Sequence, residues 1–353
     1  MTLYRKYRPQ KIAELDLLSI RERLTNVLSS GRVPHAFLFA GPKGTGKTSA
    51  ARIIAKILNC EKRKSGSDLV AIEPCNKCDS CISITEGRDM DVLEIDAASN
   101  RGIEEIRDLR EKIKLAPTSS RFKVYIIDEV HMLTTEAFNA LLKTLEEPPA
   151  HAIFILATTE ADKLLPTIIS RCSRFDFRKA TKEEIVQSLK RVAKGEKVSV
   201  DNKVLEMIAS SSDGSFRDAT KILEQAAAED ALTYEKILNI LGEVDVRSGN
   251  KFLQFIFEKK AKESLELLEQ LNSKGINIKT FTGKLLVILH DILLAKHGLV
   301  NSESGFEKID ISDINNLIKL FSRVYAEYKT AIIPELPLEI AIVEWCESKV
   351  KSF

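Results

Sequence analysis

The chain has 353 residues, 44% of them hydrophobic and 29% charged, which is the composition of a soluble globular protein with two or three domains. It contains no run of about 18 apolar residues, and its first ten residues include no apolar segment, so we expect neither a membrane span nor a secretion signal. The formal net charge of +2 does not by itself indicate nucleic-acid binding, so any such site must be a local patch. These features predict a cytoplasmic location.

The first chemical motif is the segment 41–48 (GPKGTGKT), which lies between an apolar run at 36–40 and an apolar-periodic stretch at 51–58. This order predicts a buried strand, a P-loop and a helix that begins near Lys47. Glycines let the loop backbone wrap around phosphates, and the N-terminus of the helix adds a favourable dipole. We expect Lys47 to reach the β- and γ-phosphates and Thr48 to ligate Mg²⁺. The predicted phosphate-binding residues are Gly41, Pro42, Lys43, Gly44, Thr45, Gly46, Lys47 and Thr48.

Four of the six cysteines fall in the next segment, where Cys75, Cys78 and Cys81 form a CxxCxxC pattern and Cys60 precedes them. Four thiolates satisfy tetrahedral Zn²⁺ in a closed structural site, and disulfides are disfavoured in the cytoplasm. The spacing therefore predicts a zinc module at 60–81, to which we assign no catalysis. A redox pair or an iron–sulfur cluster is the alternative.

A second half of a nucleotide site follows the apolar segment 123–127 (KVYII), which predicts a buried strand that ends at Asp128 and Glu129. The carboxyl ends of parallel strands face the ligand crevice of an α/β sheet. We expect Asp128 to hold Mg²⁺, directly or through water, and Glu129 to polarise the attacking water as a general base. The alternative is that one carboxylate is only solvated or caps the next helix.

Strand and helix patterns alternate up to about residue 178, and together they predict a parallel three-layer α/β domain over 1–178. Besides the two strands above, strands are predicted at 92–95, 152–157 and 174–177, and helices around 103–113 and 138–145. After that point the pattern is helical only. A capping box at Thr181 and Glu184 opens a small helical domain over 179–243, and a C-terminal helical domain covers 244–353.

Resemblance to a known family rests on nine features of the chain: YRKYRP, HAFLFAGPKGTGKTS, the four cysteines, EIDAASN, FKVYIIDEVHML, FNALLKTLEEPP, FILATTE, ISRC and GSFRDA. They closely resemble those of the bacterial DNA polymerase III gamma/tau family, the AAA+ ATPases of the sliding-clamp loader. The likeness runs through about residue 243, while the C-terminal third matches mainly by length and helix content. It implies an AAA+ domain, a helical lid and a collar-like oligomerisation domain. The chain resembles a short, gamma-like product or a piece cut from a longer one.

The resemblance also implies roles for three residues outside the two nucleotide motifs. Arg171, in the triplet Ser-Arg-Cys, is similar to the arginine finger that acts on the ATP of a neighbouring subunit, where a guanidinium stabilises developing charge. Thr158 resembles sensor 1, which holds the lytic water or the γ-phosphate. Arg217, in GSFRDA, resembles sensor 2, which touches the phosphate of its own subunit's ATP. For each arginine, a surface salt bridge is the alternative.

The resemblance also implies which residues contact the adenine base of ATP and which contact DNA. Tyr7, Arg8 and Pro9 are expected to contact adenine, although the Gly-Gln pair that the family usually carries after them is missing from KIAELDLLSIRERL. Asn100 and Arg101 fall where such loaders contact DNA phosphates, and a helix N-terminus with a nearby cation suits a phosphate. An ordinary solvated helix start is the alternative for this pair.

The function implied by the resemblance is that of an ATPase motor that opens a ring-shaped sliding clamp and places it on primed DNA during replication. Its cofactors are ATP, Mg²⁺ and Zn²⁺, and its partners are other clamp-loader subunits in a hetero-oligomeric ring, the clamp and primer-template DNA, with no membrane. One alternative is another oligomeric AAA+ ATPase that remodels DNA, against which the cysteines and the Ser-Arg-Cys triplet argue. The other is a structural subunit of the loader, against which the intact Lys47, Thr48, Asp128 and Glu129 argue. Nothing in the chain resembles a polymerase active site.

Overall fold

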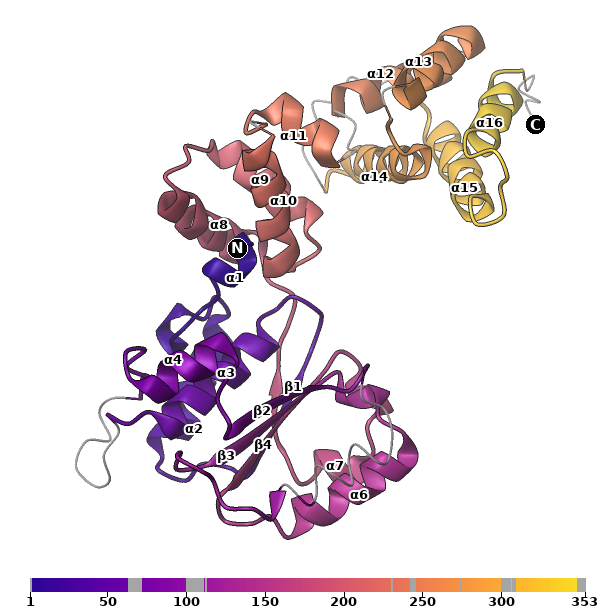
Figure 1. Ribbon diagram of the computed structural model, residues 1–353. Helices are drawn as coiled ribbons and strands as arrows, with labels where there is room; N and C mark the ends of the chain where they lie inside the picture. The colour runs from indigo at the N-terminus through magenta and orange to yellow at the C-terminus, as the bar shows by residue number, and fades with distance from the viewer. Residues whose placement is uncertain are drawn as a thin grey trace. The chain divides into compact units, whose positions relative to one another are not determined.

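The computed structural model describes residues 2–62, 72–99, 111, 113–229, 231–241, 246–273, 275–299, 306 and 309–347, without the side chains of 140, 239, 246 and 247. The chain divides into two compact units, Met1–Asp230 and Ala231–Phe353 (Figure 1). The finer division into three domains, with boundaries after residues 178 and 243, stays a prediction. Asn100, Arg101 and most of the helix predicted around 103–113 lie outside the described residues.

A five-stranded parallel sheet with the order β2-β3-β4-β1-β5 forms the centre of the first unit. Its strands lie within two residues of the predicted ones: β1 (Ala36–Ala40), β2 (Val92–Asp96), β3 (Lys123–Asp128), β4 (Ala152–Thr158) and β5 (Ser173–Asp176). Every residue of β1 and β4 is buried. Strands covered on both faces read as continuous apolar runs, which explains why AFLFA and AIFILAT show no alternation of polar and apolar residues.

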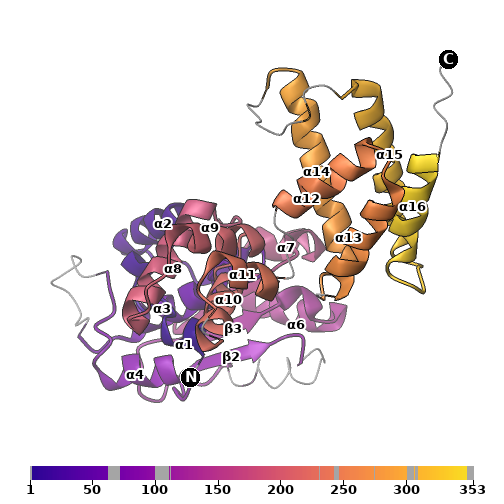
Figure 2. The ribbon, with the colours of Figure 1, turned by 90° about the horizontal axis from the view of Figure 1, so that it is seen from above.

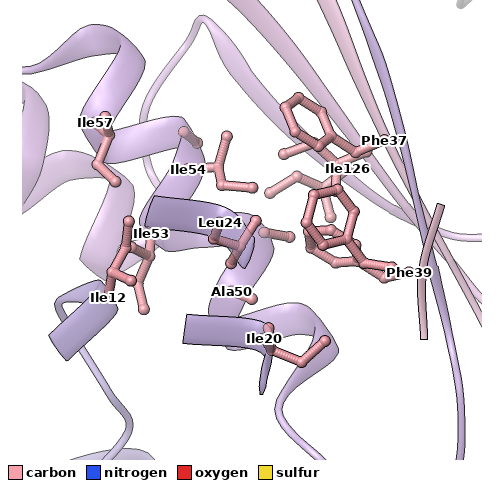
Figure 3. Packing of buried hydrophobic residues seen from close by; sticks show 14 of the residues in the cluster. Ile12, Ile20, Leu24, Phe37, Phe39, Ala50, Ile53, Ile54, Ile57 and Ile126 are labelled. Carbon is pink, nitrogen blue, oxygen red and sulfur yellow. The ribbon is translucent and has the colours of Figure 1, made fainter. Parts of the chain in front are cut away.

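Helices cover both faces of the sheet and create two separate cores (Figure 1). On one face, Leu24 of α2 (Leu18–Ser29) and Ile53 of α3 (Lys47–Asn59) pack against Phe37 and Phe39 of β1 (Figure 3). On the other, α6 (Thr135–Glu146) and α7 (Pro166–Ile169) pack against the opposite side chains of β1, β3 and β4. The predicted three-layer α/β architecture is confirmed.

Short helical segments and three longer helices complete the first unit. The short ones are α1 (Leu3–Lys6), η1 (Ile12–Glu14), α4 (Asp79–Glu86), η2 (Val130–Met132) and η3 (Ala161–Lys163). The longer ones are α8 (Lys182–Glu196), α9 (Asn202–Ser211) and α10 (Phe216–Ala228). The predicted capping box of α8 is present, because the Thr181 side chain accepts from the Glu184 N–H and the Glu184 carboxylate accepts from the Thr181 N–H.

The second unit is entirely helical in its described residues (Figure 2). Its helices are α11 (Tyr234–Leu241), α12 (Val246–Phe257), α13 (Ala261–Ser273), α14 (Ile278–Lys296), α15 (Ile311–Glu327) and α16 (Leu336–Glu347). Leu268 and Leu271 lie in one core with Phe252, Phe281 and Phe321, so the aliphatic stripe of α13 is core packing. Across the described residues, we find no helix with the length and apolarity that a membrane crossing requires.

Candidate functional site

The P-loop connects the carboxyl end of β1 to the N-terminus of α3, in the predicted context. Two of its positions require glycine for two reasons: the backbone has a positive φ, and other atoms lie where a Cβ would be. A Cβ on Gly41, whose φ is +148°, would lie 1.9 Å from the Phe177 carbonyl oxygen. A Cβ on Gly44, whose φ is +78°, would lie 2.0 Å from Ser215 Oγ. The loop is therefore fitted between the end of β5 and the start of α10, and its conformation depends on both.

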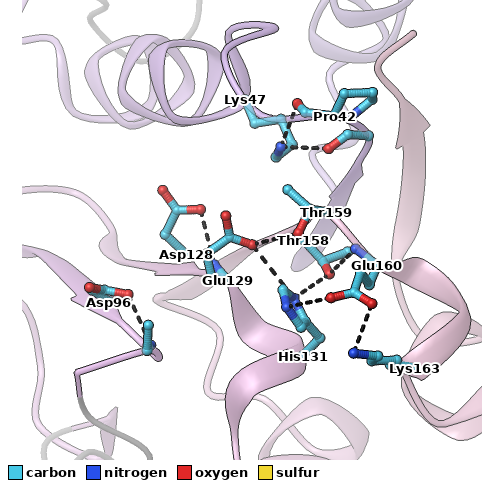
Figure 4. Close-up of polar contacts among 12 residues, drawn as sticks. Pro42, Lys47, Asp96, Asp128, Glu129, His131, Thr158, Thr159, Glu160 and Lys163 are labelled. Atoms are coloured by element: carbon cyan, nitrogen blue, oxygen red, sulfur yellow. Dashed lines mark hydrogen bonds and ion pairs between the residues drawn. The ribbon is translucent and has the colours of Figure 1, made fainter. Parts of the chain in front are cut away.

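Two residues at the start of α3, Lys47 and Thr48, are the predicted phosphate and Mg²⁺ ligands. Lys47 Nζ donates to the carbonyls of Gly41 and Pro42 at 2.6 and 2.9 Å (Figure 4). Burial lowers the pKa of Lys47, while the carboxylates of Glu129 and Asp128 oppose that shift. The Thr48 hydroxyl donates to Asp128 Oδ2 at 2.8 Å, so the fold brings together two oxygen ligands from residues 80 positions apart. Oxygen donors of this kind are the ones that Mg²⁺ prefers.

Glu129 directly follows β3 and has a left-handed backbone, with φ of +48°. Its Oε2 accepts from the Thr159 hydroxyl at 3.1 Å and lies 3.5 Å from His131 Nδ1 (Figure 4). His131 Nδ1 lies 2.9 Å from the hydroxyl oxygen of Thr158, which also accepts from the Glu160 N–H at 3.0 Å. Polar groups at the ends of β3 and β4 thus surround the predicted general base. The sequence motifs did not identify His131 or Thr159 as site residues, although each lies beside or close to a predicted one.

A cavity of about 180 Å³ adjoins the P-loop. Its wall includes P-loop residues, the acidic pair, part of the N-terminal segment and parts of α8 and α10. The predicted residues that line it are Lys43, Gly44, Thr45, Gly46, Lys47, Thr48, Asp128, Glu129, Tyr7, Arg8, Pro9 and Arg217. Leu15, Asp16 and Leu17 also line it, so the stretch that lacks the expected Gly-Gln pair still forms part of the wall.

Arg8 and Arg217 place positive charge in the wall of this cavity. Arg217 lies with its guanidinium carbon 4.7 Å from the centroid of the Tyr4 ring, and the N–H of its neighbour Phe216 donates to the Gly44 carbonyl at 3.1 Å. Burial is the main cause that lowers the pKa of Arg8. The positive charges of Arg52 and Arg217 lower it further. Cations that depress one another's pKa favour an anionic ligand, so the cavity is suited to a polyphosphate.

Four residues predicted for the nucleotide site are not among the described residues that line the cavity, namely Gly41, Pro42, Thr158 and Arg171. The Thr158 side chain is fully buried, and its hydroxyl contacts His131 and Glu160 as above. Arg171 Nη2 lies 2.8 Å from Glu146 Oε1, and Nη1 donates to the Thr167 carbonyl at 2.7 Å. This side chain is 34% exposed, and in the isolated chain it forms the surface salt bridge that was the alternative interpretation.

The four predicted metal ligands, Cys60, Cys75, Cys78 and Cys81, come together, with all Sγ atoms within 4.8 Å of one another. The Cys75 and Cys81 sulfurs are 4.0 Å apart, close to the roughly 3.8 Å that a tetrahedral site with Zn–S bonds of about 2.3 Å requires. Burial opposes ionisation of Cys75, but the N–H groups of Lys77 and Cys78 donate to its sulfur and lower its pKa to about 6. Four converging sulfurs, one of which accepts from two backbone N–H groups, fit a closed structural zinc site.

Comparison with known proteins gives the family. The family model "DNA polymerase III, delta subunit" matches residues 18–181, and "DNA polymerase III clamp loader subunit, ATPase lid domain" matches residues 184–229. DNA polymerase III subunit tau of Bacillus subtilis is 41% identical over 99% of this chain and 64% of its own length. DNA polymerase III subunit gamma of Buchnera aphidicola is 38% identical over 96% of this chain and 91% of its own length. The chain belongs to the bacterial DNA polymerase III gamma/tau family.

Membership of the gamma/tau family confirms the resemblance and the AAA+ class of the fold, with helices α8–α10 as the lid. The chain spans only part of the longer relatives, for example 45% of subunit tau of Escherichia coli, to which it is 39% identical. Among solved structures, the Holliday junction branch migration motor RuvB of Thermotoga maritima matches with a TM-score of 0.48 and 20% identity. That match covers 71% of this chain and 80% of the other.

Proposed function

We propose that this gamma/tau family member is an ATP-hydrolysing motor subunit of the replicative clamp loader, which uses ATP to load the sliding clamp onto primed DNA. The observation that carries the proposal is the hydrogen bond from Thr48 to Asp128, which joins the P-loop to the acidic end of β3 beside Glu129. Both halves of a hydrolytic nucleotide site are therefore adjacent in one cavity, as a motor requires and a purely structural subunit does not.

Each group in the cavity has a role in this proposal. Lys47 and the loop N–H groups bind the β- and γ-phosphates, and Thr48 and Asp128 hold Mg²⁺, which when bound neutralises phosphate charge. Glu129 takes the proton of the attacking water, while Thr159 fixes the direction of its carboxylate. Tyr7, Arg8 and Pro9 contact the base, and Arg217 contacts the phosphates from the lid. Thr158 acts as sensor 1 by orienting His131, which lies beside the general base Glu129.

Replacing Lys47 by Ala tests the nucleotide site. We expect ATP to bind roughly 10- to 150-fold more weakly, because a hydrogen bond to a charged group contributes about 1.5–3 kcal/mol. Titration of a fluorescent ATP analogue in the presence of Mg²⁺ measures this change. Lys203→Ala, which removes an exposed lysine from α9, is the control and should bind like the unaltered chain. Equal affinity in Lys47→Ala would contradict the assignment of this loop.

Zinc content tests the cysteine cluster. The purified chain should contain one zinc ion, because four thiolates close a tetrahedral site. Cys78→Ser should lose most of this metal, whereas Cys346→Ser, which alters a cysteine outside the cluster, should keep it. Metal analysis by mass spectrometry gives the result. An unaltered chain purified without chelator and found almost free of zinc would contradict the site.

Partners distinguish the proposed motor from the other classes. We expect the ATPase rate of the assembled loader to rise when sliding clamp and primed DNA are added together. Asn100 and Arg101 are proposed DNA contacts, so Arg101→Ala should reduce the DNA-dependent part of this rise. Stimulation by a branched DNA junction in the absence of clamp would favour a remodelling ATPase. Unchanged turnover in the complex when Lys47 of this chain is replaced would favour a structural subunit.

A further inference from the structure

One wall of the nucleotide cavity consists of residues 7–17, which we call the N-terminal strap. Its only regular structure is the three-residue turn η1, so its own backbone hydrogen bonds do little to hold it in place. Tyr7, Arg8, Pro9 and Asp16 line the cavity. Other groups of the strap, at Gln10, Ile12 and Ala13, are bound to a different part of the chain. That part is the cysteine module at 60–81.

Glu73, two residues before Cys75, makes the most direct of these contacts. Its two carboxylate oxygens accept from the N–H groups of Ile12 and Ala13, each at 2.8 Å. Hydrogen bonds from backbone N–H groups to a carboxylate are charge-assisted and about twice as strong as neutral ones. One side chain of the module therefore fixes two consecutive peptide groups of the strap.

Lys56 of α3 makes the second connection and is only 1% exposed. Its Nζ donates to Gln10 Oε1 at 2.5 Å and to Asn76 Oδ1 at 2.8 Å. Asn76 lies between Cys75 and Cys78, has a φ of +55°, and donates from its amide to the Gln10 carbonyl at 3.3 Å. A buried ammonium that has lost water needs such partners, so strap, module and α3 are joined by one polar network.

We infer that the cysteine module holds the N-terminal strap in its nucleotide-binding arrangement, so that occupancy of the metal site is coupled to binding of the base and ribose end of the nucleotide. This rests on the proposed function. The P-loop is fitted against Phe177 and Ser215, which lie outside the module, so the phosphate end should not depend on the module. Coupling of this kind is reciprocal. A change that loosens the strap weakens nucleotide binding, and bound nucleotide in turn stabilises the module. Sequence alone presents the module and the nucleotide cavity as separate, and the strap is what connects them.

The test compares ATP with inorganic tripolyphosphate, which has no base or ribose. Glu73→Ala should bind ATP about five- to tenfold more weakly, which corresponds to a strap correctly placed roughly 10–20% of the time. Its affinity for tripolyphosphate should stay within about twofold of the unaltered chain. Competition against a fluorescent ATP analogue measures both, and metal analysis should find the zinc content unchanged. Glu73→Gln keeps one acceptor oxygen and should give an intermediate loss.

A matched control is Glu86→Ala. This change removes from α4 an exposed carboxylate that pairs with Arg88. It should leave both affinities unchanged. Removing zinc with a chelator should weaken ATP binding by the unaltered chain and add little to the loss in Glu73→Ala, because both changes release the same strap.

The outcomes separate this inference from the proposed function. Equal ATP affinity in Glu73→Ala and the unaltered chain would overturn the inference alone. Equal losses for ATP and tripolyphosphate would also overturn it, because they would point to general destabilisation. If the unaltered chain bound no ATP, the proposed function would fail and the inference with it.

Discussion

Replacing Glu129 by Gln is expected to lower ATP hydrolysis by about 10²- to 10⁴-fold, the usual contribution of a positioned general base. The amide keeps the shape of the side chain and can still accept from the Thr159 hydroxyl, but it cannot take a proton from water. ATP binding should persist, because Lys47, Thr48 and Asp128 are unchanged. Single-turnover hydrolysis, measured with an equilibrium binding titration, separates the two effects. The assembled complex should accumulate as an ATP-bound loader attached to its clamp.

The control for this variant is Glu136→Gln, which removes the charge of an exposed carboxylate in the first turn of α6. It should hydrolyse ATP at the unaltered rate. Turnover by Glu129→Gln at the same rate as this control would show that another group accepts the proton. Loss of ATP binding together with turnover would mean that Glu129 supports the site rather than acting as its base.

Local sequence pattern was enough to predict the sheet, the P-loop and the cysteine cluster. The runs AFLFA and KVYII are fully or almost fully buried strands, and a P-loop needs glycines within a few residues of one another. Three of the four cysteines converge because the CxxCxxC spacing confines them to a short segment of chain. In each case the physical requirement applies to a short stretch of chain, so it can be recognised from the spacing of residues in the sequence.

Contacts between distant residues could not be predicted in this way. Gly44 is constrained by Ser215, and Glu73 binds the N–H groups of Ile12 and Ala13, yet neither pairing has any periodicity in the sequence. The hydroxyl of Thr159 holds Glu129 only because β3 and β4 are neighbours in the sheet. Such polar pairs follow from strand order and loop placement, and the residues themselves look like ordinary surface groups until the fold is known.

Arg171→Ala is expected to have the largest effect on turnover. If the guanidinium stabilises charge that develops on a neighbour's ATP, its loss should slow hydrolysis by about 10³- to 10⁵-fold in the assembled complex, while each subunit still binds ATP. Within its own chain Arg171 pairs with Glu146 at 2.8 Å, an exposed salt bridge that contributes about 0–1 kcal/mol to stability. Glu146→Gln breaks the same pair and leaves the guanidinium in place, so it should keep turnover. Equal loss in both variants would mean that the salt bridge, not catalysis, explains Arg171.

Mixing two inactive variants tests whether Arg171 acts between chains. A Lys47→Ala subunit binds little ATP but still offers Arg171, whereas an Arg171→Ala subunit binds ATP but offers no guanidinium. Where the first adjoins the second in the correct order, a complete site forms from parts of two chains, and the mixed assembly should regain a fraction of the unaltered rate. The regained activity should fall on dilution, because the complete site exists only while subunits are associated. If assemblies shown to contain both variants regain no activity, Arg171 does not act in trans and its role lies within its own chain.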